Sequence, residues 1–123
     1  MCEKFSQKIG TVLQKLERVI QQRRNDLSPD SYTTTLFLAG IEKIAAKLAE
    51  ESLELIDAAK ICTTESAKEQ VTHEAADLMY HFLVLLAACD VTLLDVEQEL
   101  ARRFGVSGLI EKASRKIRLF RKH

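Results

Sequence analysis

The hydrophobic positions along the chain follow the 3.6-residue period of α-helices. Over residues 3–24, apolar side chains recur every three or four positions, with Lys, Gln, Glu and Arg between them. No stretch shows the two-residue alternation of a strand. The pattern therefore predicts an all-α fold, a helical bundle of four to five main helices. The predicted helices span residues 3–24, 34–39, 41–61, 67–89, 93–104 and 109–120.

Short polar segments separate these predicted helices. Residues 25–30, Asn-Asp-Leu-Ser-Pro-Asp, are typical of a turn. The hydroxyls of residues 31–34 can cap the short helix that follows, and Gly40 predicts a break before the next one. Residues 63–66 and Thr92 offer the same kind of cap further on. The separators therefore predict where each helix begins.

The helix predicted over 67–89 is unusual because it is apolar on almost every side from Ala75 onward. A helix of this kind lies at the centre of a bundle or is buried against a second subunit. The pattern leaves both arrangements open; in the second, dimerisation would complete the bundle.

Composition limits the class of protein. With 123 residues, the chain is expected to form a single domain, residues 1–123. A formal net charge of zero gives no electrostatic argument for binding nucleic acid or a membrane. The longest apolar run, Phe82–Cys89, is far shorter than the roughly 20 residues that span a bilayer. Three cysteines without a CxxC pair, and no recognisable signal peptide, favour a cytoplasmic location.

Two pairs of acidic residues stand three positions apart on predicted helices: Glu51 with Glu54, and Glu74 with Asp77. Residues at this spacing share one face of a helix. On the first helix the apolar arc lies about 20–140° from Glu51, so Glu51 is expected at its edge, with Lys47 beside it and Glu50 further round. The residues expected on that arc are Ile41, Ile44, Leu48, Leu55, Ile56 and Ala59.

Two facing stripes of carboxylates would repel each other unless a cation lay between them. Oxygen ligands suit Mg²⁺ or Mn²⁺. A di-iron centre would call for Glu-x-x-His, which is absent, as are a P-loop and a G-x-S-x-G turn. The plainer interpretation stays open: a solvated flank with a Lys47–Glu51 pair, a salt-bridged Asp77, and His81 as an ordinary core histidine.

Several stretches resemble a known family. Glu50-Glu51-x-x-Glu54 followed by Glu74-x-x-Asp77 resembles the metal signature of the all-α nucleoside triphosphate pyrophosphohydrolases. Ser31-Tyr32-Thr33 and Glu74-Ala75-Ala76-Asp77-Leu78-Met79-Tyr80-His81 narrow the resemblance to the phosphoribosyl-ATP pyrophosphohydrolase family of histidine biosynthesis. One departure is Ala49, where that family often has glycine.

The resemblance implies an enzyme that hydrolyses phosphoribosyl-ATP, a small phosphorylated nucleotide, to phosphoribosyl-AMP and pyrophosphate with Mg²⁺, acting as a homodimer. It implies Glu51, Glu54, Glu74 and Asp77 as metal ligands. Glu50 would be a further ligand or orient the attacking water, and Lys47 would meet phosphate charge. Expected substrate contacts or supports of the site are Tyr32, Thr33, Tyr80, His81 and Arg115.

Two alternatives remain. A housecleaning pyrophosphatase acting on (deoxy)nucleoside triphosphates would carry the same acidic signature. A non-catalytic helical dimer would carry acidic stripes that bind no metal, so Mg²⁺ would leave its stability unchanged.

Overall fold

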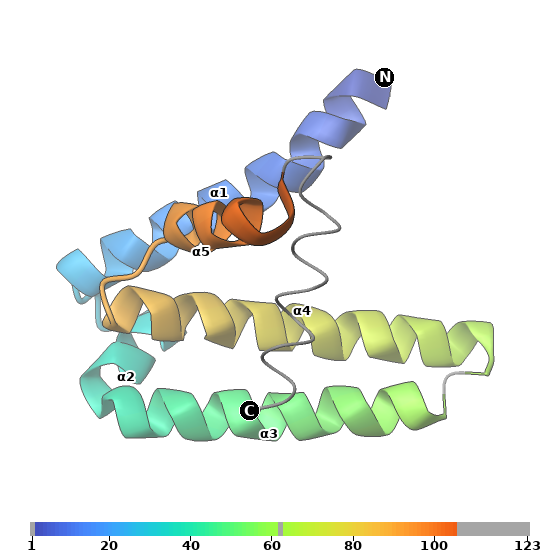
Figure 1. Ribbon diagram of the computed structural model, residues 1–123. Coiled ribbons are helices and arrows are strands. Elements are labelled where there is room, and N and C mark those ends of the chain that lie inside the picture. The colour runs from blue at the N-terminus through green and yellow to red at the C-terminus, as the bar shows by residue number, and fades with distance from the viewer. Residues whose placement is uncertain (1, 62, 106–123) are drawn as a thin grey trace. The chain divides into compact units, whose positions relative to one another are not determined.

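The computed structural model describes residues 2–61 and 63–105, with side chains from residue 12 onward. Within this part of the chain the regular structure is entirely helical, which confirms the all-α prediction (Figure 1). The helix predicted over 109–120 and the candidate residue Arg115 lie outside the described residues. The elements are α1 (Cys2–Asn25), α2 (Tyr32–Ala39), α3 (Ile41–Lys60), α4 (Glu65–Ala88), α5 (Leu93–Leu100) and the π-helical η1 (Ala101–Gly105).

The predicted caps begin the helices. The Ser31 hydroxyl accepts a hydrogen bond from the Thr34 amide at 3.3 Å, so α2 begins at Tyr32, two residues earlier than expected. Thr64 caps α4, and Thr92 forms a reciprocal capping box with Asp95 at the start of α5. Gly40 separates α2 from α3 with a φ of +94°, a conformation that residues with a Cβ rarely adopt.

The chain forms two compact units, Met1–Asp90 and Val91–His123, which are described separately. In the first, α3 and α4 run antiparallel along their lengths, α1 packs on α4, and the short α2 contacts the other three (Figure 1). The helix α4 thus contacts every other helix of this unit, as its apolar surface predicted. The core side chains with the least exposure are Ile20, Thr34, Ile44, Leu83 and Val84.

The second unit contains α5 and η1. One helix was predicted over 93–104, but the α-helical hydrogen bonding ends at Leu100 and a π-helical turn follows. Glu99 accepts hydrogen bonds from the Nε atoms of Arg102, at 2.9 Å, and Arg103, at 2.8 Å. Those two guanidinium groups, that of Arg102 foremost, lower the pKa of the Glu99 carboxyl to about 2.

The buried face of α3 differs from the predicted one. Ile41 and Ile56 were expected in the core but are 51% and 48% exposed, and Ala59 is exposed too. The buried stripe runs instead through Ile44, Glu51 and Ala58, so Glu51 lies at its centre rather than its edge. The prediction from helical phase treated the whole apolar arc of α3 as core. In one chain, part of that arc stays exposed.

Part of that uncovered surface forms an apolar groove of about 460 Å³. It is lined from α3 and α4 by Leu48, Ser52, Leu55, Ala75, Leu78, Met79 and Phe82. No single helix of the described residues combines the length and apolar composition needed to cross a membrane, although α4 and the segment after it reach that composition together.

Candidate metal centre

Three glutamates converge where α3 lies against α4. Glu51 and Glu54 come from α3, one turn apart, and Glu74 comes from α4. One carboxylate oxygen from each lies within 4.8 Å of the others. Glu51 and Glu74 are each only 7% exposed, whereas Glu54 is open to solvent. The sequence predicted that acidic residues on these two helices would face each other, and the positions of the three glutamates agree with that prediction.

Each of the two buried carboxylates has one oxygen without the partner that a buried charge needs. Among the described residues, neither Glu51 Oε2 nor Glu74 Oε2 has a hydrogen-bond partner. Burial, and after it the neighbouring Glu54, raises the pKa of both carboxyl groups above the ordinary value. A buried carboxylate is costly without a compensating charge. The unpartnered oxygens and the all-carboxylate donor set fit a hard divalent cation such as Mg²⁺.

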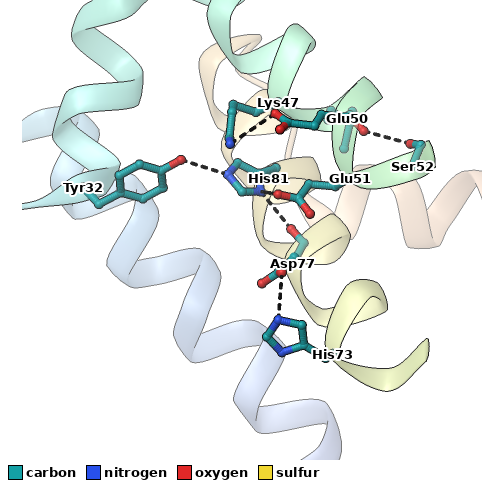
Figure 2. A network of polar contacts seen from close by, with 9 residues as sticks. Tyr32, Lys47, Glu50, Glu51, Ser52, His73, Asp77 and His81 are labelled. Carbon is teal, nitrogen blue, oxygen red and sulfur yellow. Dashed lines mark hydrogen bonds and ion pairs between the residues drawn. The ribbon is translucent and has the colours of Figure 1, made fainter. Parts of the chain in front are cut away.

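Asp77 lies one turn beyond Glu74 but does not belong to the same compact group. Its side chain is 42% exposed, and its Oδ2 lies 3.4 Å from His73 Nε2 (Figure 2). A donor atom each from His73, Glu74 and Asp77 lies within 4.8 Å of the others. The four predicted carboxylate ligands thus form two overlapping groups that share Glu74.

His73 is not among the ligands that the sequence predicted. It stands four residues before Asp77, a spacing that places both side chains on one face of α4 and was visible in the sequence.

His81 is 5% exposed and uses both ring nitrogens within the protein. Its Nδ1 lies 2.9 Å from the Asp77 carbonyl oxygen, which can only accept, so Nδ1 carries the proton. In the neutral ring Nε2 therefore accepts a hydrogen bond from the Tyr32 hydroxyl, 3.2 Å away (Figure 2). Nδ1 also lies 3.9 Å from Glu51 Oε1. His81 thus joins α2 to the helix that carries Glu74 and sits against Glu51.

The aromatic residues beside His81 form a small cluster. The Tyr32 and Tyr80 rings stack with their centroids 6.2 Å apart and their planes at 24°. Thr33 is buried, and its hydroxyl is hydrogen-bonded to that of Tyr80. Burial is also the main cause that raises the pKa of the Tyr80 hydroxyl. Tyr32, by contrast, is 52% exposed, so its ring is the member of the cluster that a ligand can reach.

Lys47 and Glu50 form a pair on α3. Lys47 Nζ donates to Glu50 Oε2 at 3.3 Å, and this bond raises the pKa of the lysine. The alternative prediction of a Lys47–Glu51 ion pair is wrong, because the ion-pair partner of Lys47 is Glu50. The Glu50 side chain is 55% exposed and that of Lys47 27%, so the Glu50 carboxylate is the more open of the two charges beside the buried glutamates.

Known proteins resemble this chain over most of its length. Residues 13–104 match the family described as phosphoribosyl-ATP pyrophosphohydrolase. The phosphoribosyl-ATP pyrophosphatase of Geotalea daltonii is 45% identical over 104 residues, which cover 85% of this chain and 94% of that protein. The protein of the same name from Geobacter sulfurreducens is 46% identical over 104 residues, covering 85% and 93%. A third such protein, from a Janthinobacterium species, is 47% identical over 111 residues, covering 88% and 98%. The chain therefore belongs to the phosphoribosyl-ATP pyrophosphohydrolase family.

Proposed function

We propose that this chain hydrolyses phosphoribosyl-ATP to phosphoribosyl-AMP and pyrophosphate in histidine biosynthesis, with Mg²⁺ as its cofactor. Family membership and the names of its relatives support the substrate. The observation that carries the metal requirement is the pair of buried carboxylates, Glu51 and Glu74, each with an oxygen that no described residue partners. Buried carboxylate oxygens need a compensating positive charge, and a bound cation would supply it.

Glu51, Glu54 and Glu74, whose carboxylates lie together, would hold the Mg²⁺, with Asp77, one turn along α4, as the fourth predicted ligand. Mn²⁺, which accepts the same oxygen ligands, could replace Mg²⁺. When bound, the cation supplies positive charge against the phosphate oxygens. The Glu51–Glu54–Glu74 group offers only carboxylate oxygens, the kind of ligand that a hard cation prefers.

The side chains around the carboxylates supply the remaining functions. Lys47 adds a second positive charge that a polyphosphate can contact, and its bond to Glu50 keeps it protonated. The solvent-exposed Glu50 carboxylate can orient the attacking water and accept its proton. The exposed Tyr32 ring can stack on the substrate base, while Thr33, Tyr80 and His81 support that ring from within. Arg115 remains a predicted substrate contact.

The decisive assay measures pyrophosphate release from phosphoribosyl-ATP in Mg²⁺ and in chelator, beside ATP and a panel of deoxynucleoside triphosphates. We expect Mg²⁺-dependent turnover of phosphoribosyl-ATP in preference to the panel. Glu51→Gln should lower it by more than about 100-fold, because even residues that only support metal ligands cost 10–100-fold. Glu42→Gln, an exposed glutamate in the first turn of the same helix, is the matched control.

Two results would redirect the proposal. Turnover of the plain nucleotides without any on phosphoribosyl-ATP would identify a housecleaning pyrophosphatase. No turnover of either, together with a melting temperature that Mg²⁺ leaves unchanged, would identify the non-catalytic helical dimer.

We also propose that two copies of the chain associate through the apolar groove between α3 and α4. The groove leaves Leu78, Met79 and Phe82 without full cover in one chain, and a patch of this kind is typical of an interface. A cytoplasmic location remains an expectation from the cysteine pattern.

A further inference from the structure

His73 is a potential metal ligand that the proposed Mg²⁺ position does not use. Its Nε2 lies 3.4 Å from Asp77 Oδ2, one helical turn along α4 (Figure 2). Two ligands each about 2.1 Å from a tetrahedral cation lie roughly 3.4 Å apart. Both side chains are open to solvent, at 67% and 42% exposed, so a cation could reach them and water could complete its coordination.

Glu74 provides a second sign that a ligand is missing at this place, beside the spacing of His73 and Asp77. Its carboxylate is 7% exposed and lies within 4.8 Å of the donor atoms of His73 and Asp77. Oε1 accepts a hydrogen bond from Gln70 Nε2 at 2.7 Å, whereas Oε2 has no partner among the described residues. Buried polar atoms in proteins are nearly always hydrogen-bonded, so an unpartnered oxygen on a buried carboxylate indicates that a partner is missing.

We propose that His73, Glu74 and Asp77 form a second cation position, which takes a borderline divalent metal such as Zn²⁺ through one imidazole nitrogen and two carboxylates. This inference rests on the proposed function, because Glu74 and Asp77 also belong to the proposed Mg²⁺ position.

The donor set determines the class of metal. Imidazole is a common ligand of Zn²⁺ and of other first-row transition metals, whereas Mg²⁺ prefers oxygen ligands and retains waters. The Glu51–Glu54–Glu74 group contains only carboxylates, but the His73–Glu74–Asp77 group adds a nitrogen. The two positions should therefore differ in the metal they prefer, although they share Glu74 and the predicted fourth Mg²⁺ ligand Asp77.

The test is calorimetric titration of the full chain with ZnCl₂ and, separately, with MgCl₂. His73→Gln removes the imidazole and keeps a polar, helix-compatible side chain. His123→Gln, which removes a histidine elsewhere in the chain, is the matched control. Circular dichroism of each variant checks that the helical content is unchanged.

We expect His73→Gln to weaken Zn²⁺ binding at least about 10-fold, the lower end of the loss caused by disturbing a metal site. The Mg²⁺ affinity of His73→Gln should equal that of the unmodified chain. His123→Gln should have the same affinity as the unmodified chain for both metals. Equal Zn²⁺ affinity and stoichiometry with and without His73 would overturn the second position, as would no Zn²⁺ binding by the unmodified chain.

The two metals separate this inference from the proposed function. A Zn²⁺ affinity that depends on His73, in a chain that binds no Mg²⁺, would uphold the second position and refute the Mg²⁺ centre. If Glu51→Gln abolishes Mg²⁺ binding and His73→Gln leaves Zn²⁺ binding unchanged, the Mg²⁺ centre is upheld and the second position is refuted.

Discussion

Among the side chains that the structure describes, Glu51 and Glu74 are buried carboxylates that each keep one oxygen without a hydrogen-bond partner. Replacing Glu51 with Gln in chelator should raise the melting temperature by roughly 4 °C, because removing a buried repulsive charge worth about 1 kcal/mol shifts a domain of this size by that amount. The same variant should lose the stabilisation that Mg²⁺ gives. Differential scanning calorimetry with and without Mg²⁺ measures both effects, with Glu42→Gln as the control.

The raised pKa values of these two carboxyl groups make the metal-free chain sensitive to pH. The folded state holds protons that the unfolded state has released, so stability is complete below the ordinary pKa of about 4.3 and falls as pH rises through the raised values. Asp90 and Glu99, whose pKa values are lowered, act in the opposite direction and below about pH 4. Urea unfolding in chelator should therefore show stability falling as the pH rises above the ordinary glutamate pKa of about 4.3. A steady gain of stability towards pH 8 would contradict this expectation.

The Tyr32 hydroxyl and the Tyr32 ring have separable effects. Tyr32→Phe keeps the stack on Tyr80 but leaves His81 Nε2 without its donor, which should cost about 1 kcal/mol of stability. Tyr32→Ala also removes the exposed ring and should raise the KM for substrate several-fold more than Tyr32→Phe does. Steady-state kinetics of the two variants distinguish the effects, and equal KM values would exclude the ring as a substrate contact.

The carboxylate pairing was predictable, because spacing along a helix determines which residues share a face, and Glu51 and Glu74 lie opposite each other. The surroundings of His81 were not. Its bond to Tyr32 depends on how α2 approaches α4 across 49 residues of sequence, and no local pattern encodes that approach. The same is true of the bond between Thr33 and Tyr80.

Among the helices, the α2–α3 junction depends on one residue. Gly40 has a φ of +94°, and although an added Cβ would meet nothing within 4 Å, the backbone conformation itself disfavours it. Gly40→Ala should lower the free energy of unfolding by about 1–3 kcal/mol. Urea denaturation measures the loss, and Ala46→Gly, at an exposed position within α3, is a control that should cost about 1 kcal/mol.

Helix ends were easier to predict than helix faces. Ser31, Thr64 and Thr92 each cap the helix that follows, because a cap is a local hydrogen bond. The buried face of α3 was misplaced, because the apolar arc contains both side chains that face the core and side chains such as Ile56 that remain exposed in one chain. The π-helical turn after Leu100 has no clear sequence signal.

For the assembled protein, the apolar groove of α3 and α4 predicts self-association. Met79→Glu places a charge on a groove residue that is 40% exposed, so it should shift the chain from dimer to monomer without unfolding it. Leu38→Glu changes an exposed leucine of α2 outside the groove and should leave the assembly unchanged. Sedimentation velocity provides the measurement, and an unmodified chain that sediments as a monomer would refute the interface.

The unpartnered oxygens of Glu51 and Glu74 also bear on how long the protein survives. A cation that binds only the folded chain, at a free concentration about 100 times its dissociation constant, stabilises it by about 2.7 kcal/mol. That energy corresponds to a roughly 100-fold smaller unfolded population, which is the form that proteases cleave when opening and closing are fast. Depletion of magnesium should therefore shorten the lifetime of the polypeptide itself, so that the supply of cation governs the amount of enzyme as well as its rate.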